Sequence, residues 1–328
     1  MAGKIKLIAG LVVVMLIVTA GAIWLLKNEK NQKEENNSEN HVEFVKEAVS
    51  TGAEIYNGTE IAFDSDLMST VNNWNSNVMT YKSNFFITKQ NAGEVARRFG
   101  ITSSNLVDAQ EGWKIGNNTE EIEFITTDRT PDGYAVWLRY RDWAGEKQSI
   151  EFMSDDAAMK KVQEFTNNTI IPTLEHASKN LTFTYKQVGV DRVFSNGREY
   201  IIAKVFDVAL SYDSVQLSWK YSMRVNATGE VIWVDGPADF QLLPDIIVYI
   251  GTPTDILNFY KENGMEVDNA SDIECIVIYG LKLLYGPFPT STGIKFTPFY
   301  SIDYRVIHTS GSDETHRDYL DIKGVSAP

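Results

Sequence analysis

The stretch Val215–Val225 reads VQLSWKYSMRV, and its apolar and polar residues alternate without exception. Because successive side chains of a strand point to opposite faces of a sheet, this alternation predicts a strand with one buried face and one face in water. Asn226–Gly229 is typical of a turn, so we expect residues 231–234 to return beside it as a hairpin. Residues 181–185 and 200–210 are predicted to extend the same sheet, and the second of these, apolar on both faces, is expected to be central.

Helices are predicted ahead of each group of strands. One begins at Thr88, and a second begins at Ser154, which is followed by two aspartates in the first turn. Thr252 and Asp255 have the spacing of a capping box, with a proline at the first helical position. The spacing of apolar residues also favours a helix over residues 42–55.

The order of these segments predicts an α+β protein in which antiparallel sheets are each packed by one or two helices. We expect two domains, residues 43–153 and residues 154–328. A further division of the second domain near residues 236–250 remains open. Pro298 lies inside the last long apolar segment, and a proline cannot donate a hydrogen bond to a neighbouring strand. That segment is therefore predicted to lie at a sheet edge around Pro298.

Residues 8–26 read IAGLVVVMLIVTAGAIWLL, a run without a single charge. As a helix it would span about 28 Å, close to the thickness of the hydrocarbon core of a bilayer. Ala20-Gly21-Ala22 has the form of a signal cleavage site, but an apolar stretch follows it directly, which favours an uncleaved anchor. The sequence thus predicts a transmembrane helix at the N-terminal end of the fold. Residues 1–7 are interpreted as a cytoplasmic tail and residues 27–42 as a polar linker, with the bulk of the chain outside the cell membrane.

The charge and the cysteine content restrict the class of partner and the compartment that we expect for this protein. A net charge of −14 and a pI near 4.8 argue against a nucleic acid partner, because phosphates attract clustered Lys and Arg. Cys275 is the single cysteine, so no intramolecular disulfide can form. A large exported domain without disulfides is typical of a bacterial surface.

Two family resemblances follow from these segments. An N-terminal anchor followed by helix-then-strand modules resembles the regulators of the YycH and YycI type, which restrain envelope-stress sensor kinases in Gram-positive bacteria. A long helix followed by strands that end in YSMRVNATGEVI, residues 221–232, is similar to the nuclear-transport-factor-like domains of membrane-anchored conjugation proteins. Both resemblances imply a non-enzymatic, membrane-anchored protein, and the first implies a Gram-positive cell surface.

No nucleotide-binding loop and no common hydrolase motif occurs in the sequence, and we expect no cofactor. The one candidate metal cluster is His308, Asp313, Glu314 and His316. Its surroundings are rich in Ser, Gly and Thr, which favours a solvated tail without a scaffold to hold ligands in place.

Trp74, Trp143 and Phe299 are the candidate residues for an interaction surface. The leading hypothesis is a membrane-anchored, non-enzymatic protein that binds another envelope protein, as a regulator of a sensor system or as a component of a secretion or conjugation apparatus. One alternative is a receptor for a small ligand or a peptide, with a pocket between a helix and a sheet. The other is an envelope hydrolase that uses carboxylates distant in sequence.

Overall fold

The computed structural model of this chain divides into two units, Met1–Val42 and Glu43–Pro328. The structure describes residues 44–46, 54–56, 61–64, 67, 76–103, 105–127, 133–149, 151–213, 215–267, 272–290 and 293–322. All of these belong to the second unit. In these ranges no helix has the length and apolar character needed to cross a membrane. The predicted tail, anchor and linker at residues 1–42 lie outside the described residues.

The strand predicted from alternation is β11 (Val215–Val225), and every second residue from Leu217 to Val225 is buried. Its C-terminal half pairs with β12 (Val231–Pro237), which confirms the predicted hairpin. On its other side lies β10 (Arg198–Tyr212), which in turn pairs with β9 (Leu181–Ser195). β10 is therefore central, as its apolar residues on both faces predict.

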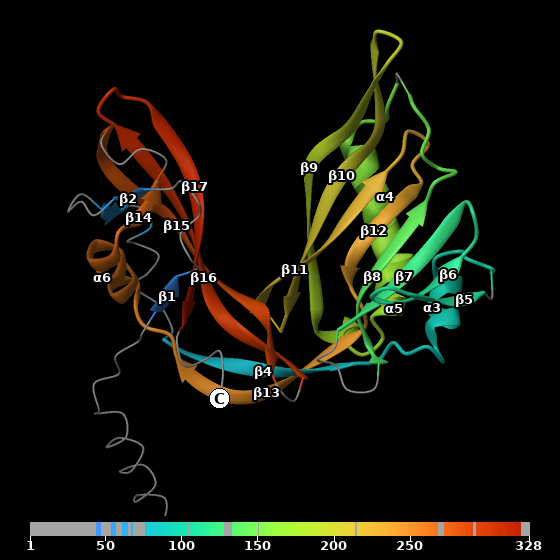
Figure 1. The fold of residues 1–328 in the computed structure, drawn as a ribbon, viewed down its shortest axis with the longest axis horizontal. Helices are drawn as coiled ribbons and strands as arrows, with labels where there is room; N and C mark the ends of the chain where they lie inside the picture. Colours follow the sequence, from blue (N-terminus) through green and yellow to red (C-terminus); the bar gives the residue numbers. More distant parts are fainter. Residues whose placement is uncertain are drawn as a thin grey trace, which may run out of the picture. The chain divides into compact units, whose positions relative to one another are not determined.

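The sheet extends from β12 through β8 (Ala135–Asp142), β7 (Glu120–Thr126), β6 (Gly112–Gly116) and β5 (Leu106–Ala109) (Figure 1). In the other direction β11 meets β15 (Ile273–Thr290), followed by β16 (Gly293–His308), β17 (Asp313–Ile322) and β1 (Phe44–Lys46). β4 (Asn77–Phe85) pairs with β16 and with β13 (Phe240–Tyr249). β3 (Ile61–Phe63) runs parallel to β15, and β14 (Met265–Val267) pairs with β2 (Glu54–Tyr56) in a separate sheet.

The helices are short, and two of the three predicted starts, Ser154 and Thr252, are confirmed. The side chain of Ser154 caps α4 (Asp155–Phe165), and both halves of the capping box at Thr252 form at the start of α6 (Pro253–Asn263). The predicted start at Thr88 is wrong, because α3 spans Ala92–Arg98 and its N-cap is Asn91. Residues 89–91 form a turn instead, in which Oδ1 of Asn91 accepts the backbone N–H of Thr88. After α4 the chain continues as a π-helical turn, Thr166–Ile170, the short α5, Ile171–Thr173, and a 3-10 turn, Ser178–Asn180.

The predicted fold class is wrong: the described residues are mostly β, with a large mixed sheet and few helices. Strands that were assigned to separate antiparallel sheets join one 15-stranded sheet. This sheet is mixed because β15 runs parallel to both β3 and β11. The helix predicted over residues 42–55 is also wrong where the structure describes it, since Phe44–Lys46 and Glu54–Tyr56 are strands. Their partners, β17 and β14, lie more than two hundred residues away, and local spacing carries no information about them.

Strand pairing also crosses the predicted domain division at residue 153. β8 pairs with β12 and β4 pairs with β13, so strands from both predicted domains share the sheet. The division itself stays a prediction. Pro298 lies where β16 changes its partner on one side, because pairing with β17 stops at Phe299 and pairing with β4 covers Lys295 and Phe296. A residue without an N–H donor fits at this change of partner.

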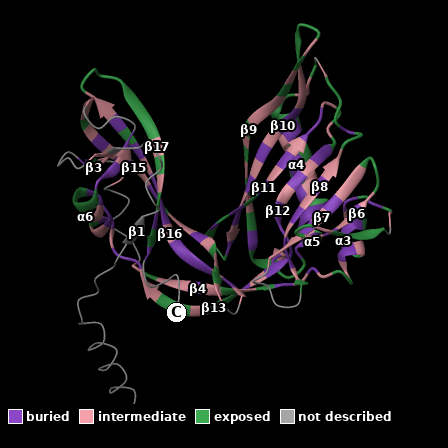
Figure 2. Cartoon of the chain, viewed as in Figure 1, coloured by how far each residue is buried: buried purple, intermediate pink, exposed green. Residues whose placement is uncertain are grey.

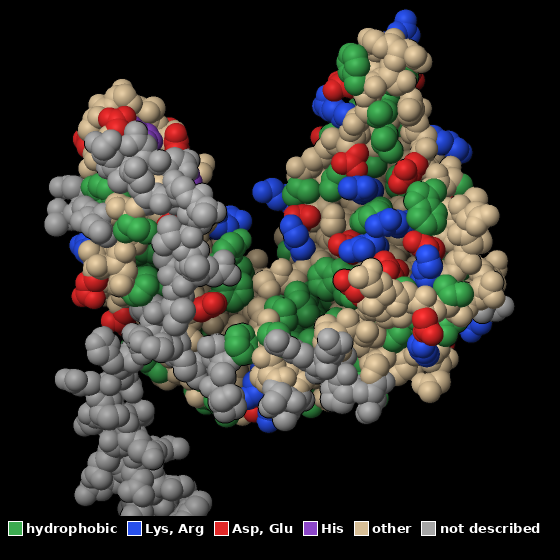
Figure 3. Space-filling model, in the orientation of Figure 1, with side chains coloured by type: hydrophobic (Ala, Val, Ile, Leu, Met, Phe, Trp, Pro, Cys, Tyr) green, Lys and Arg blue, Asp and Glu red, His purple; other side chains and the backbone are tan. Residues whose placement is uncertain are grey.

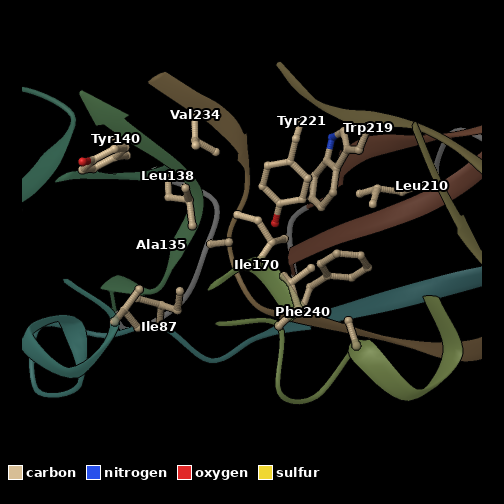
Figure 4. Packing of buried hydrophobic residues seen from close by; sticks show 14 of the residues in the cluster. Ile87, Ala135, Leu138, Tyr140, Ile170, Leu210, Trp219, Tyr221, Val234 and Phe240 are labelled. Atoms are coloured by element: carbon tan, nitrogen blue, oxygen red, sulfur yellow. The ribbon is translucent and has the colours of Figure 1, made fainter. Parts of the chain in front are cut away.

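Buried residues run along β16, β11 and β12 (Figure 2), and the hydrophobic core continues across the junction of β11 with β15. Trp219 of β11 lies at the centre of an aromatic cluster in this core. Its ring centroid is 4.6 Å from that of Phe296 on β16 and 5.5 Å from that of Phe240 on β13, both edge to face. Figure 4 shows Trp219 and Phe240 in this core together with Tyr221. Edge-to-face aromatic contacts therefore fix the strands on both sides of the junction.

Candidate functional site

A groove of about 770 Å³ lies over the junction between β11 and β15. Its first wall is formed by residues of β9, β10 and β11, and its second wall by residues of β15, β16 and β17. The lining residues are Thr184, Lys186, Val188, Asp207, Ala209, Gln216, Leu217, Ser218, Trp219, Lys220, Lys282, Leu284, Gly286, Pro287, Phe288, Thr297, Phe299, Arg317, Tyr319 and Asp321. We refer to this surface as the groove.

Strand alternation explains which side chains reach the first wall. On β11 the buried residues face the core, so Gln216, Ser218 and Lys220 point to the opposite face. The antiparallel register places Lys220 opposite Ala209 of β10 and places Asp207 opposite Lys186 of β9. The polar half of the period-two pattern thus becomes one wall of the groove.

The second wall is built by the same rule on three antiparallel strands. Leu284, Phe299 and Asp321 lie opposite one another on β15, β16 and β17. Two residues further along, Lys282 and Tyr319 flank Ser301 in the next row on the same face. Apolar and charged groups therefore lie side by side on this wall.

The floor of the groove lies where the two walls meet. β11 and β15 are joined there by a parallel bridge between Leu217 and Tyr285. Gly286 follows that bridge, and a methyl group at this position would lie 2.9 Å from Cε1 of Phe299 and 3.4 Å from Oγ of Ser218. The absence of a side chain at Gly286 lets Phe299 of one wall and Ser218 of the other approach the same point.

Positive charge prevails among the lining residues: four cations, Lys186, Lys220, Lys282 and Arg317, against the two carboxylates of Asp207 and Asp321. Lys220 forms an ion pair with Asp207, with 2.5 Å between Nζ and Oδ2. Nε of Arg317 lies 2.5 Å from Oδ1 of Asp303, and this hydrogen bond raises the pKa of Arg317.

Lys186 and Lys282 differ from the other two cations. Both side chains are exposed, and neither forms an ion pair with another residue in the described part of the chain. They lie on opposite walls, Lys186 on β9 and Lys282 on β15. Two ammonium groups are thus available to an anion in a protein whose net charge is −14.

Exposed apolar groups accompany these cations. Phe299 contacts Tyr319 edge to face, with ring centroids 5.9 Å apart. Tyr319 is 44% exposed and Val188 on the other wall is 48% exposed. Exposed apolar side chains gathered in a concave surface are typical of a binding site.

Of the three residues predicted to form an interaction surface, the structure places Phe299 in the groove. Trp143 follows β8 and is 38% exposed, but it is not among the groove residues. Trp74 lies outside the described residues. Sequence reasoning missed Lys186, Lys282 and Tyr319, because nothing local distinguishes them from other exposed residues of alternating strands.

The residues of the predicted metal cluster lie on two paired strands rather than in an irregular tail. His308 ends β16, and the other three residues lie on β17. Nε2 of His316 lies 3.4 Å from Oε2 of Glu314. Nε2 of His308 lies 3.9 Å from the other carboxylate oxygen of Glu314, Oε1. Asp313 instead lies near Arg305. Across the described ranges, no three His, Cys, Asp or Glu side chains are grouped as metal ligands.

One histidine–carboxylate pair has the contacts of a catalytic dyad. Nδ1 of His176 lies 2.7 Å from Oδ2 of Asp239, whose side chain is 5% exposed, and the imidazole stacks on Phe86 with 3.5 Å between ring centroids. Burial raises the pKa of Asp239, although hydrogen bonds from His176 oppose this. Asp239 also accepts the backbone N–H of His176, so the pair ties the segment after α5 to the turn between β12 and β13. Among the described residues, no serine or cysteine side chain forms a hydrogen bond with the imidazole of His176 or the carboxylate of Asp239.

The face of the sheet formed by β7, β8, β12 and β11 is strongly charged (Figure 3). Arg139 lies between Glu123 and Asp235, and Trp233 is stacked between the guanidinium groups of Arg141 and Arg224 at 4.3 and 4.8 Å. Charges of both signs are interleaved here, and several form ion pairs, although Nε of Arg141 has no hydrogen-bond partner among the described residues. The groove differs from this face in being concave and in carrying apolar side chains beside its cations.

Comparison with known proteins provides no functional parallel. No protein-family model and no curated protein matches this chain. A crystal structure of an uncharacterized protein from Eubacterium rectale has a TM-score of 0.42 and 10% sequence identity, over 82% of this chain and 89% of that chain.

Proposed function

We propose that this chain is a non-catalytic binding protein whose groove holds an anionic segment of another protein of the cell envelope. The observation that carries the proposal is the pair of exposed ammonium groups, Lys186 and Lys282, on opposite walls of a concave and partly apolar surface. In an acidic protein such a surface differs in sign from its surroundings, and it would attract and orient an oppositely charged partner.

Binding is favoured over hydrolysis by what surrounds the carboxylates. Hydrolysis by a carboxylate pair needs two acidic groups that face one cleft in different states of protonation. Of the described residues, two carboxylates line the groove, but Asp207 is held by Lys220, and Asp321 lies on the opposite wall. Asp239 is buried with His176 in a separate place and lines no described part of the groove.

The groove is open rather than enclosed, which favours a segment of a protein over a small ligand. A pocket for a small molecule usually buries most of its ligand. A segment that enters an open groove can continue beyond both ends of it, and the contacts with two walls can add together. The anchor predicted at residues 8–26 would hold the groove close to other membrane proteins.

Photo-crosslinking in cells that produce the full-length chain tests this function. A photoreactive residue would replace Val188, which lines the groove, and in a control it would replace Phe194, which is 74% exposed outside the groove. We expect one envelope protein to crosslink from position 188 and not from position 194. The product should disappear when Lys186 and Lys282 are both changed to Glu. A product that is equal at both positions, or unaffected by the two lysine changes, would contradict the proposed function.

A further inference from the structure

We infer that the groove takes an acidic peptide segment that also carries apolar side chains, with its carboxylates contacted by Lys186 and Lys282 and its apolar groups by Phe299 and Tyr319. This inference rests on the proposed function and specifies the chemistry of the partner.

The first step is charge complementarity. Lys220 and Arg317 already have carboxylate partners, and so they add little net attraction. Lys186 and Lys282 are exposed and without an ion pair to a described residue, so they determine the sign of the occupant. Because they stand on different walls, one segment would need acidic side chains at separated positions to reach both.

The second step is the apolar surface that lines the groove together with the two lysines. Leu284, Phe288 and Phe299 line the second wall, and Val188 lines the first. Tyr319 remains 44% exposed although it already contacts Phe299. A partner whose apolar side chains cover this surface removes apolar area from water, and this contributes favourable binding free energy. A partner with charged groups alone does not gain this contribution.

The third step distinguishes a peptide from a uniform polyanion. A polyphosphate or an anionic glycan polymer carries the same charge at every repeat and is best matched by a continuous row of cations. Here the carboxylates of Asp207 and Asp321 interrupt the cations, and apolar side chains lie between them. A chain in which acidic and apolar side chains are interspersed matches this mixture.

Selection from a library of random decapeptides displayed on phage tests the inference, with the purified full-length chain as bait. We expect enriched peptides to combine Asp or Glu with Phe, Leu or Trp. Their affinity, measured by fluorescence anisotropy, should fall at least about tenfold for the double variant Lys186→Glu, Lys282→Glu, and should weaken with salt. The double variant Lys160→Glu, Lys179→Glu, at exposed positions on α4 and in the turn Ser178–Asn180, changes the net charge by the same amount outside the groove. It is the matched control and should bind as the unmodified chain does.

The inference would be overturned if the enriched peptides lacked carboxylates or bound the double variant with equal affinity. It would also be overturned if inorganic polyphosphate displaced the peptides and its own binding required Lys186 and Lys282. The crosslinking experiment separates the two proposals. A crosslink that depends on the lysines, together with a library that yields no acidic peptides, would leave the proposed function standing and remove only the peptide inference. If, in addition, the chain with both lysines unmodified gives no specific crosslink from position 188, both proposals are removed.

Discussion

Phe299 covers Gly286 at the floor of the groove so closely that a methyl group on Gly286 would lie 2.9 Å from Cε1 of the ring. The two residues belong to neighbouring strands, β16 and β15. The position of the Phe299 ring, and with it the depth of the groove, therefore depends on the lack of a side chain at residue 286.

Gly286→Val is expected to displace the Phe299 ring and to weaken binding of an acidic peptide by about tenfold, because the apolar part of the groove is filled. Fluorescence anisotropy with the selected peptides measures this. Gly189→Val is the matched control, because Gly189 also lies in a strand and nothing approaches its added methyl group within 4 Å. Equal affinity of the two variants would argue against this role of Gly286.

Gly236→Ala is expected to destabilise the fold by about 3 kcal/mol, because overpacking a filled core forces its neighbours to move. A methyl group there would lie 2.0 Å from Cδ1 of Tyr221. Tyr221 is fully buried, and its hydroxyl donates a hydrogen bond of 2.6 Å to the carbonyl oxygen of Pro237. Urea denaturation gives the free energy of unfolding. A second change, Tyr221→Leu, should cost less in the Gly236→Ala background than alone, and additive effects would show that the two sites do not contact.

Asp239→Asn is expected to alter the pH dependence of stability. Burial raises the pKa of Asp239 above 3.8, so the folded chain holds this proton more tightly than the unfolded chain. The resulting stabilisation is complete below pH 3.8 and is lost as the pH rises through the folded pKa. As the pH rises through this range, the unfolding free energy of Asp239→Asn minus that of the unmodified chain should therefore increase. Urea denaturation at a series of pH values measures it, and a decrease would contradict the assignment.

Asp245→Asn is expected to show the opposite slope. Asp245 lies 2.8 Å from Nζ of Lys82 and 2.9 Å from Nζ of Lys295, and these ammonium groups lower its pKa below 3.8. Its stabilisation is present above pH 3.8 and is lost as the pH falls through the folded pKa. At neutral pH the variant should be less stable by about 1 kcal/mol, since solvent screens part of the attraction.

The same denaturation series compares the two aspartates directly. Opposite pH slopes for Asp239→Asn and Asp245→Asn would separate an effect of burial from an effect of neighbouring cations. Two slopes of the same sign would show that a common cause, such as the net charge of the chain, dominates.

Structural features that depend on contacts between residues close in sequence could be predicted from the sequence. The alternation in residues 215–225 correctly predicts β11 and its hairpin with β12, because side-chain direction repeats every two residues in any strand. The capping box at Thr252 and Asp255 likewise predicts the start of α6, since its hydrogen bonds span three residues. The interaction role of Phe299 stays a prediction, and its place in the groove could not be read from the sequence.

What the sequence by itself determined is therefore the faces of individual strands and the starts of the helices capped by Ser154 and Thr252. Only the tertiary structure decided that these strands form one mixed sheet instead of several antiparallel ones, because a free strand edge can pair with any other edge. It also brought Lys186 and Lys282 to opposite walls of one groove. That arrangement depends on the bridge between Leu217 and Tyr285 and on the contact of Trp219 with Phe296, which join residues too far apart for any local pattern to relate.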